Sequence, residues 1–348
     1  MDKLKIIWID TSMYLLKKTG IGMYILMLID CFERLKVNYK CVELKLSEKV
    51  GKKPLLVLIW HNTILFLKTF FIRPNIIIFP CCLMPFMQIR GVKYVTVIHD
   101  LCSFNDYMNK GIAILHRYGI KTAAKKADII VTVSDSTKQD LIKLLNINPN
   151  KIKVIYNTVP KHFINSKDNL SLLTKYNIES HKYILSVATL NIHKNIPELI
   201  KAFEQISDKY PNIKLVLVGG MGNEQREKLT KHTNIIFTGY VKDDELPTLY
   251  KNALLYVYPS LYEGFGIPLI EAQYSGCPVL CSDIPVFKEI GANSVMYCKP
   301  TAEGITRGLQ DLINNIGRLQ ELSQLGKKNV ERFTIEKITN QVEVILNE

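Results

Sequence analysis

Eleven short apolar runs, rich in Ile and Val, recur along the chain and constrain its fold more than any other feature. Each run is bounded by turn residues and followed by a polar stretch with helical character. Runs that are apolar on both faces are typical of parallel strands covered by helices, so the alternation predicts doubly wound α/β sheets. The predicted strands are Ile6–Ile9, Ile76–Phe79, Tyr94–Ile98, Ile129–Val133, Lys153–Ile155, Tyr183–Val187, Lys214–Val218, Ile235–Phe237, Leu254–Tyr258, Val279–Cys281 and Ser294–Tyr297.

The length of 348 residues and the hydrophobic content of 47% favour two domains over a single core. A break falls near Pro160–Leu170, where a polar stretch separates two sets of predicted strands. We therefore predict two α/β domains, residues 1–165 and 166–330, with a cleft between them. Ligands of such sheets bind beyond the carboxyl ends of the strands, near the point where the strand order reverses.

The formal net charge of +13 predicts an anionic partner. Nucleic acid, an anionic membrane surface and a phosphorylated substrate all carry the required charge. A solvated, lysine-rich surface is the alternative, because many lysines occur in scattered pairs such as Lys17-Lys18 and Lys125-Lys126. The sequence shows no stripe of interleaved aromatic and basic residues, so we rank nucleic acid last among these partners.

The 8 cysteines include no Cys-x-x-Cys pair and no Cys/His set with the spacing of a zinc site. The N-terminus is interrupted too early, at Asp10, for a signal peptide. Both features favour a reducing, cytoplasmic location. No Asp, Glu or His set has metal-ligand spacing, and we interpret Asp243-Asp244 as a helix N-cap. The sequence therefore predicts no essential metal ion.

One strongly apolar segment, Leu55–Pro80, needs to be distinguished from a membrane span. Polar residues interrupt it, and no unbroken run approaches the ~20 apolar residues that a spanning helix needs. We predict a strand or helix before Asn62, an amphipathic helix through Phe71 and a strand over Asn75–Phe79. The aromatic stretch Leu65–Phe71 faces either the core, which we favour, or an anionic membrane surface.

Two glutamates bracket a glycine turn in the stretch Glu263-Gly264-Phe265-Gly266-Ile267-Pro268-Leu269-Ile270-Glu271. The turn follows a predicted strand and precedes a predicted helix. This arrangement forms an anion site, because free backbone N–H groups of the helix N-terminus point at the turn. Glu263 and Glu271 can then bind the uncharged hydroxyl groups of the same ligand. Phosphate and hydroxyl groups together are the chemistry of a sugar nucleotide.

Lys194 lies in the loop after the predicted strand Tyr183–Val187, just before a helix whose first turn holds Pro197. The positive end of a helix dipole is a poor place for a lysine if only stability matters. We therefore favour Lys194 as a diphosphate ligand, with His193 as a second donor, over the alternative of a surface lysine.

Other strand ends supply weaker candidates. Gly20-Ile21-Gly22 is either a phosphate cradle or a tight turn without a ligand. His99 is a candidate to bind a sugar hydroxyl or the acceptor, and the alternative is a structural histidine fixed by Asp100. Gly239 lets the backbone at Gly239-Tyr240 approach a base or phosphate, or serves only the turn. Ser134 or Ser136 is predicted to cap a helix.

Taken in order, these residues resemble the retaining glycosyltransferases of family 4, which have the GT-B architecture. The resemblance covers nearly the whole chain, and its most specific element is the pair Glu263 and Glu271 with seven residues between them. It implies two Rossmann-like domains that face each other across a cleft. It also implies a terminal helix, over residues 331–348, that crosses back to the first domain.

The resemblance assigns roles to individual residues. Catalysis and contact with the donor sugar are implied for His99, Lys194 and Glu263. Binding of the nucleotide and diphosphate is implied for Gly20, Gly22, His193, Lys194, Gly239, Tyr240, Gly264, Phe265, Gly266 and Glu271. Three positions depart from the family pattern, since Thr189, His193 and Met23 stand where arginines are common.

The function implied is transfer of a hexose from a nucleotide-diphosphate sugar to a glycan or polyprenyl-linked acceptor, in the biosynthesis of cell-surface polysaccharide or lipopolysaccharide. Lys194 and helix N-termini stabilise the leaving diphosphate, and the acceptor attacks from the front face without a cofactor. Peripheral attachment to the inner face of the cell membrane suits the basic, apolar first domain. The alternatives are a sugar-nucleotide epimerase or hydrolase of the same fold, and a non-catalytic module that binds polyanions or membranes.

Overall fold

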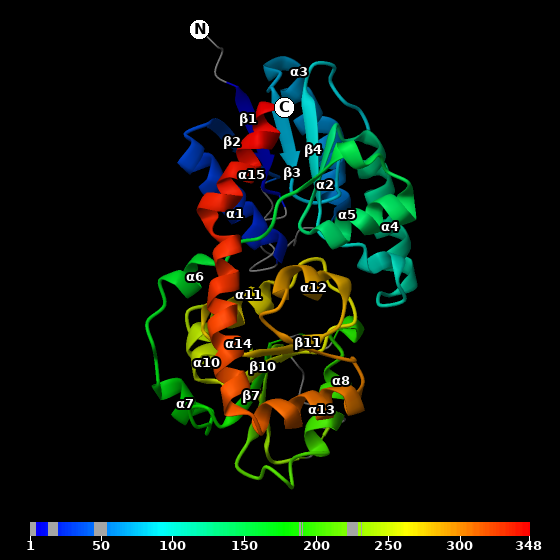
Figure 1. Cartoon of the computed structure of the whole chain (residues 1–348). Helices are drawn as coiled ribbons and strands as arrows, with labels where there is room; N and C mark the ends of the chain where they lie inside the picture. Colours follow the sequence, from blue (N-terminus) through cyan, green and yellow to red (C-terminus); the bar gives the residue numbers. More distant parts are fainter. Residues whose placement is uncertain are drawn as a thin grey trace. The chain divides into compact units, whose positions relative to one another are not determined.

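The computed structural model of the chain describes residues 5–12, 20–44, 54–187, 189, 191–220, 229–230 and 232–348. The chain divides into two compact units (Figure 1). The N-terminal unit contains Met1–Thr158 and Ile335–Glu348, and the C-terminal unit contains Val159–Thr334.

These boundaries differ by a few residues from the ones that the sequence suggests, after residues 165 and 330. The reason is aromatic packing within the C-terminal unit. Phe163 packs on Tyr250 with ring centroids 5.6 Å apart, and Phe333 packs edge-on to Phe265 at 5.5 Å. Both short segments are therefore held by the C-terminal unit.

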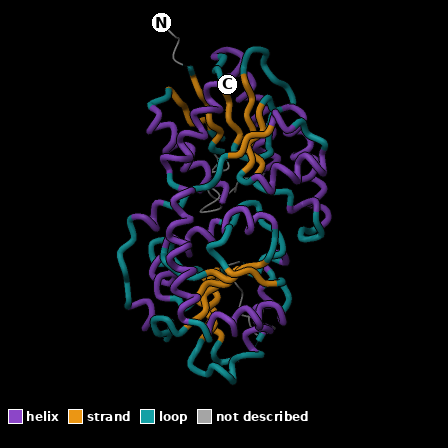
Figure 2. The backbone as a smooth tube through the Cα atoms, in the orientation of Figure 1, coloured by secondary structure: helices purple, strands orange, loops and turns teal. Residues whose placement is uncertain are grey.

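In the described residues, the N-terminal unit is built on a six-stranded parallel sheet with the order β2-β1-β3-β4-β5-β6. Figure 2 shows the strands in orange among the surrounding helices. Since β2 and β3 flank β1, the strand order reverses at β1. The strands are β1 (Ile6–Asp10), β2 (Asn38–Val42), β3 (Ile76–Phe79), β4 (Lys93–Ile98), β5 (Ile129–Thr132) and β6 (Ile152–Val154).

Helices cover both faces of this sheet. On one face, α1 and α15 pack on strand residues that include Ile78 and Val95. On the other face, α2, α4 and α5 pack on the sheet through Trp60, Ile120 and Leu141, respectively. The terminal helix therefore belongs to the N-terminal unit, although it follows the C-terminal unit in sequence. The helices are α1 (Gly20–Leu35), α2 (Pro54–Trp60), α3 (Phe66–Ile72), α4 (Lys110–Lys126), α5 (Asp135–Leu145) and α15 (Ile335–Asn347).

The C-terminal unit contains a second parallel sheet, with the order β12-β11-β10-β7-β8-β9 in the part of the chain that is described. Its strands are β7 (Tyr183–Val187), β8 (Lys214–Val218), β9 (Ile235–Gly239), β10 (Leu255–Tyr258), β11 (Val279–Ser282) and β12 (Met296–Cys298). Its helices include α6 (Lys161–Ile164), α7 (Ser171–Lys175), α8 (Ile196–Glu204), α10 (Leu246–Asn252), α11 (Ile267–Tyr274), α12 (Pro285–Gly291), α13 (Ala302–Ile313) and α14 (Ile316–Asn329).

All eleven predicted strands are present, with ends shifted by at most two residues, and the doubly wound α/β fold is confirmed. β2 was not predicted. It lies at the edge of its sheet, and most of its residues are exposed, so it lacks the apolar run by which the other strands were found. The predicted cap is also correct, because Ser134 Oγ accepts the N–H of Thr137 at 3.0 Å.

The apolar segment that needed to be distinguished from a membrane span forms α2, a π-helical segment over His61–Leu65, α3 and then β3. Leu65 is buried, but Leu67, Phe70 and Phe71 are exposed, the last to 79%. The preference for core packing over Leu65–Phe71 is therefore wrong for most of this stretch. No helix in the described ranges combines the length and the apolar character needed to cross a bilayer.

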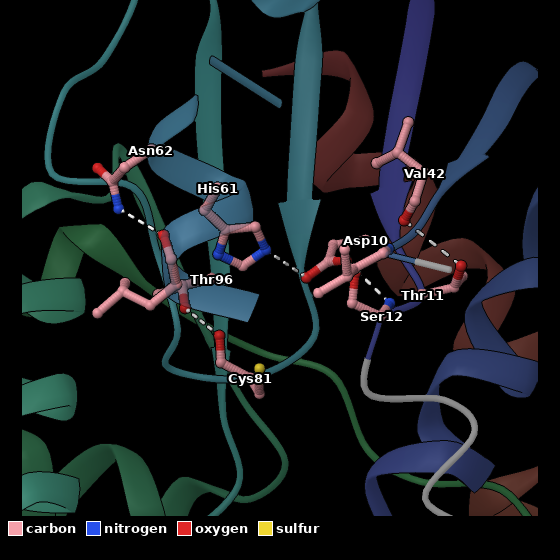
Figure 3. A network of polar contacts seen from close by, with 10 residues as sticks. Asp10, Thr11, Ser12, Val42, His61, Asn62, Cys81 and Thr96 are labelled. Carbon is pink, nitrogen blue, oxygen red and sulfur yellow. Dashed lines mark hydrogen bonds and ion pairs between the residues drawn. The ribbon is translucent and has the colours of Figure 1, made fainter. Parts of the chain in front are cut away.

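A buried, hydrogen-bonded pair of a histidine and an aspartate lies at the carboxyl end of β1 (Figure 3). His61 Nε2 is 2.9 Å from Asp10 Oδ2, and both side chains are almost completely buried. Asp10 Oδ1 also accepts the N–H of Ser12 at 2.9 Å, and Ser12 Oγ accepts the N–H of Leu44. The pair thus joins the end of β1 to the π-helical segment, where the helix widens, and to the residues after β2.

We expect Asp10→Ala to lower the free energy of unfolding by about 1–3 kcal/mol, because the buried His61 then loses its hydrogen-bond partner. Adding His61→Phe should recover part of that loss, since an apolar ring of similar size replaces the unpaired group. Denaturant unfolding of the single and double variants measures both effects. A double variant that loses the sum of the two single effects would contradict the coupling.

Candidate active site

In the C-terminal unit, the strand order reverses between β7 and β10, which are hydrogen-bonded neighbours. Lys194 lies in the loop after β7, and Glu263 lies in the loop after β10. Doubly wound sheets bind ligands beyond the carboxyl edge at such a reversal. The topology thus brings together two residues that are 69 positions apart in sequence.

Hydrogen bonds hold these two loops together. Asn195 follows Lys194 in a left-handed conformation, with φ 57°, and opens α8. Its side-chain amide donates to the carbonyl oxygen of Pro259 at 3.1 Å. The N–H of Leu261 in turn donates to the carbonyl oxygen of His193 at 2.7 Å. The backbone on both sides of Lys194 is therefore fixed relative to the loop after β10.

Lys194 and Glu263 form an ion pair at the centre of this edge. Lys194 Nζ lies 2.6 Å from Glu263 Oε1, and the side chains are 20% and 11% exposed. The ammonium group also lies 5.6 Å from the centre of the Tyr258 ring. Tyr258 is fully buried, and burial together with the nearby Glu263 carboxylate raises the pKa of its phenol. Partial burial strengthens the charge–charge and cation–π attractions relative to bulk water.

The glycine turn after Glu263 is fixed by sterics. Gly266 has φ +97°, and a Cβ atom there would lie 2.9 Å from the ring of Phe287. α11 starts at the next residue. Phe265, which lies between the two glycines in the sequence, has a buried side chain. The predicted sequence of strand, glycine turn and helix N-terminus is therefore present, and position 266 requires glycine.

Glu271 lies on α11 and is 7% exposed. The phenol of Tyr250 donates to its Oε2 at 3.2 Å. Burial raises the pKa of Glu271 to about 8, and the negative charge of Asp243 adds to the rise. The Tyr256 ring lies between Tyr250 and Tyr258, with centroid distances of 5.1 and 5.7 Å. A row of three buried tyrosines thus supports both glutamates, and sequence reasoning missed it.

The loop after β9 holds two further candidates. Gly239 ends β9 with φ 73°, and the Tyr240 side chain is 65% exposed. The Tyr240 phenol donates to Asp243 at 3.3 Å. The interpretation of Asp243-Asp244 as a helix N-cap is wrong, because Glu245 occupies the N-cap position of α10 and makes no side-chain cap bond. Asp243 instead places a negative charge near Glu271.

His99 follows β4 in the N-terminal unit. Its Nε2–H donates to the carbonyl oxygen of Pro80 at 2.9 Å, and its ring meets Tyr24 edge-on with centroids 5.1 Å apart. Burial lowers the pKa of His99, so the ring is neutral near pH 7 and Nδ1 is its acceptor nitrogen. Asp100, the anchor considered in the sequence, accepts the N–H of Cys102 instead.

Gly20 is the first residue of α1, and Gly22 lies buried in the first turn. A Cβ atom at Gly20 would meet nothing within 4 Å, so packing does not require glycine there. Lys17, Lys18 and Thr19, which precede the glycines, lie outside the described residues. Within the described residues, no group of three or more His, Cys, Asp or Glu side chains has the arrangement of a metal site.

Comparison with known proteins identifies the family. Residues 172–329 match the family described as Glycosyl transferases group 1, and residues 20–162 match Glycosyltransferase Family 4. The chain is 33% identical over 255 residues to the O-antigen chain mannosyltransferase RfbU of Salmonella typhimurium. The aligned residues make up 70% of this chain and 67% of that relative. The chain belongs to the group 1, family 4 glycosyltransferases.

One further comparison concerns a second relative, and another concerns the fold. The O-antigen chain mannosyltransferase B of Escherichia coli is 28% identical to this glycosyltransferase over 267 residues, or 72% of this chain and 69% of that relative. The structure of Anabaena HepE in complex with UDP and glucose matches with a TM-score of 0.71 at 17% identity, over 99% of this chain and 100% of that chain. The glycosyltransferase therefore has the GT-B fold, with two Rossmann-like units.

The raised pKa of Glu271 predicts how the stability of the glycosyltransferase depends on pH. Between the ordinary glutamate value of 4.5 and about 8, the folded protein keeps a proton that the unfolded chain releases. The free energy of unfolding therefore falls as pH rises through this range, by up to about 1.4 kcal/mol per pH unit. Glu271→Gln removes this contribution, so its stability relative to the native protein should increase from pH 5 to pH 9.

Thermal unfolding of the native protein and Glu271→Gln across this pH range measures the difference. Glu343→Gln, an exposed substitution on α15, controls for the loss of one negative charge. A difference between native protein and Glu271→Gln that stays constant from pH 5 to pH 9 would show that Glu271 is already ionised in the folded protein.

Proposed function

We propose that this glycosyltransferase transfers a hexose, with mannose as the first candidate, from a nucleoside-diphosphate sugar to a glycan or lipid-linked acceptor in O-antigen or related cell-surface polysaccharide biosynthesis. The names of the two mannosyltransferase relatives support the sugar and the pathway. The observation that carries the proposal is the ion pair of Lys194 and Glu263 at the strand reversal, beside a glycine turn that leads into a helix. The comparisons do not favour an epimerase or a non-catalytic module.

The residues divide into those that bind phosphate and those that bind hydroxyl groups. Lys194, with His193 and the backbone of the Gly264–Gly266 turn, neutralises the charge that develops on the departing diphosphate. Glu263 accepts hydrogen bonds from hydroxyls of the donor sugar, and Glu271 accepts them from the ribose. In this role the two glutamates hold the donor and do not act as the acid and nucleophile of a glycosidase.

The remaining details of the reaction follow the family resemblance. The neutral His99 ring, with Nδ1 as acceptor, suits a hydrogen bond from a hydroxyl of the substrate. We propose transfer with retention of the anomeric configuration, by front-face attack of the acceptor, without a cofactor or an essential metal ion. The one-bond carbon–proton coupling at the anomeric centre of the product, and activity in the presence of EDTA, test these two points.

A panel of nucleotide sugars tests the donor class. A donor present at 100 times its Kd should stabilise the protein by about 2.7 kcal/mol, which is visible as a rise in Tm. We expect one member of a panel that includes GDP-mannose and UDP-glucose to give this rise. Lys194→Ala should remove it, because the diphosphate loses its cation.

The control for this experiment is Lys209→Ala, which changes a lysine of the same unit that lies over the Tyr210 ring. It should leave the Tm rise intact. Failure of every nucleotide sugar to stabilise the native protein would contradict the proposed donor class. A normal rise in Lys194→Ala would contradict the role of Lys194 alone.

We also propose that the N-terminal unit binds the surface of an anionic membrane. α2 to α4 pack on the same face of the sheet, so their outer surfaces share one side of the unit. Apolar side chains of α3, of α4 and of the segment between β3 and β4 are exposed, and we call this set the apolar patch. Its members are Leu67, Phe70, Phe71, Phe86, Met87, Ile112, Leu115 and Tyr118.

Basic side chains lie within the apolar patch. Lys126 donates to the carbonyl oxygen of Phe86 and lies 5.4 Å from the centre of its ring. Arg73 lies 6.0 Å from the centre of the Phe70 ring. Exposed apolar side chains combined with Lys and Arg are the composition that inserts into the interface of anionic bilayers. Attachment there would bring the enzyme to lipid-linked acceptors.

Vesicle sedimentation tests membrane binding. We expect the protein to sediment with vesicles that contain roughly 30% phosphatidylglycerol. We expect much less of it to sediment with neutral phosphatidylcholine vesicles. The double variant Phe71→Ser/Leu115→Ser should reduce binding at least about tenfold, since two apolar side chains leave the interface. Val344→Ser on α15, which removes an exposed apolar side chain from the opposite face, should bind normally. Equal binding of both variants would contradict the role of the patch.

A further inference from the structure

The Lys194–Glu263 pair places a carboxylate where a phosphate group must bind. Glu263 Oε1 lies 2.6 Å from the ammonium nitrogen, and both side chains are mostly buried. A diphosphate oxygen that takes a hydrogen bond from Lys194 therefore shares this ammonium group with Glu263. Two anions that share one cation at this distance repel each other, and water screens them only in part.

Hydrogen bonds fix the backbone on both sides of the pair. The N–H of Leu261, two residues before Glu263, donates to the carbonyl oxygen of His193, next to Lys194. Asn195 binds the carbonyl oxygen of Pro259 from the other side. Beneath the pair lies the ring of Tyr258, which is fully buried. Both partners of the ion pair are thus attached to backbone that is fixed, so the carboxylate stays near any bound diphosphate.

The nucleotide sugar and the nucleoside diphosphate that remains after transfer differ in charge and in hydrogen-bond donors beside Glu263. In a nucleoside-diphosphate sugar, the terminal phosphate is esterified by the sugar, whose hydroxyls donate hydrogen bonds to a carboxylate. In the free nucleoside diphosphate, that phosphate has a second ionisation near pH 6, so it carries an additional negative charge at neutral pH. The same carboxylate therefore attracts the nucleotide sugar and repels the nucleoside diphosphate.

We propose that Glu263 is the residue by which the enzyme discriminates the nucleotide sugar from the nucleoside diphosphate, and that its ion pair with Lys194 favours release of the nucleoside diphosphate after transfer. This inference rests on the proposed function, because it assumes that a nucleotide sugar binds beside Lys194. Without Glu263, Lys194 would bind the nucleoside diphosphate more tightly than the nucleotide sugar, because the former carries more negative charge. With Glu263 beside Lys194, the nucleotide sugar binds more tightly than the nucleoside diphosphate.

Calorimetry with Glu263→Gln tests the discrimination. The probes are GDP-mannose with GDP and UDP-glucose with UDP, and the pair that binds the native protein is carried forward. The Kd of the nucleoside diphosphate should fall about tenfold in Glu263→Gln, since the neutral amide removes a like-charge contact. The Kd of the nucleotide sugar should stay equal or rise, so the ratio of the two Kd values changes at least tenfold.

Two further variants complete the experiment. Glu263→Asp keeps the negative charge but shortens the side chain by one methylene group, which moves the carboxylate away from Lys194. It should change the ratio of the two Kd values in the same direction by a smaller factor. Glu303→Gln on α13 removes an exposed charge of the same unit and should leave the ratio unchanged. Glu263→Asp also decides the question if Glu263→Gln does not fold.

The outcomes separate the two proposals. If neither nucleotide sugar binds the native protein, the proposed donor class is wrong, and the discrimination falls with it. If a nucleotide sugar binds, but both Glu263 variants keep the native ratio of Kd values, the proposed function stands and the discrimination by Glu263 is overturned.

Discussion

Parallel pairing of strands that are buried on both faces is the constraint on which both units depend. It brings all carboxyl ends of one sheet to the same edge, where the chain must leave the apolar interior and polar residues can be placed. In the first sheet, Asp10 is the last residue of β1 and His99 follows β4, and in the second sheet Lys194 and Glu263 follow β7 and β10. The helices on the two faces cover the sheets, and the candidate site residues lie mainly in the loops that follow the strands.

The strands and the glycine turn could be predicted because their signals are local. An Ile/Val run specifies a buried strand, and only glycine suits the φ of +97° at Gly266. β2 was missed because an exposed edge strand needs no apolar run. The misjudged stretch was Leu67–Phe71, since periodicity shows that a helix has an apolar face but does not show what covers that face.

In the candidate site, single residues could be predicted, but their pairings could not. Lys194 and Glu263 were both candidates, whereas their contact depends on which strands become neighbours. Asn195, Tyr250 and Tyr258 have ordinary residue types for their elements, and they gain importance only from what the fold places beside them. The same holds for Asp10 and His61, which are separated by 51 positions and meet inside the core. Long-range contacts of this kind leave no local pattern.

The crossing of α15 back onto the N-terminal unit has a consequence for biogenesis. Val342 and Ile345 cover the sheet face that α1 covers only in part. During synthesis, the first 158 residues therefore emerge without part of their own core, while the whole C-terminal unit is translated. The first unit to be made is thus the last that can be completed, against the usual order in which N-terminal domains finish folding first. The sheet face that α15 covers stays exposed for that interval, and exposed apolar surface of this kind is prone to aggregation.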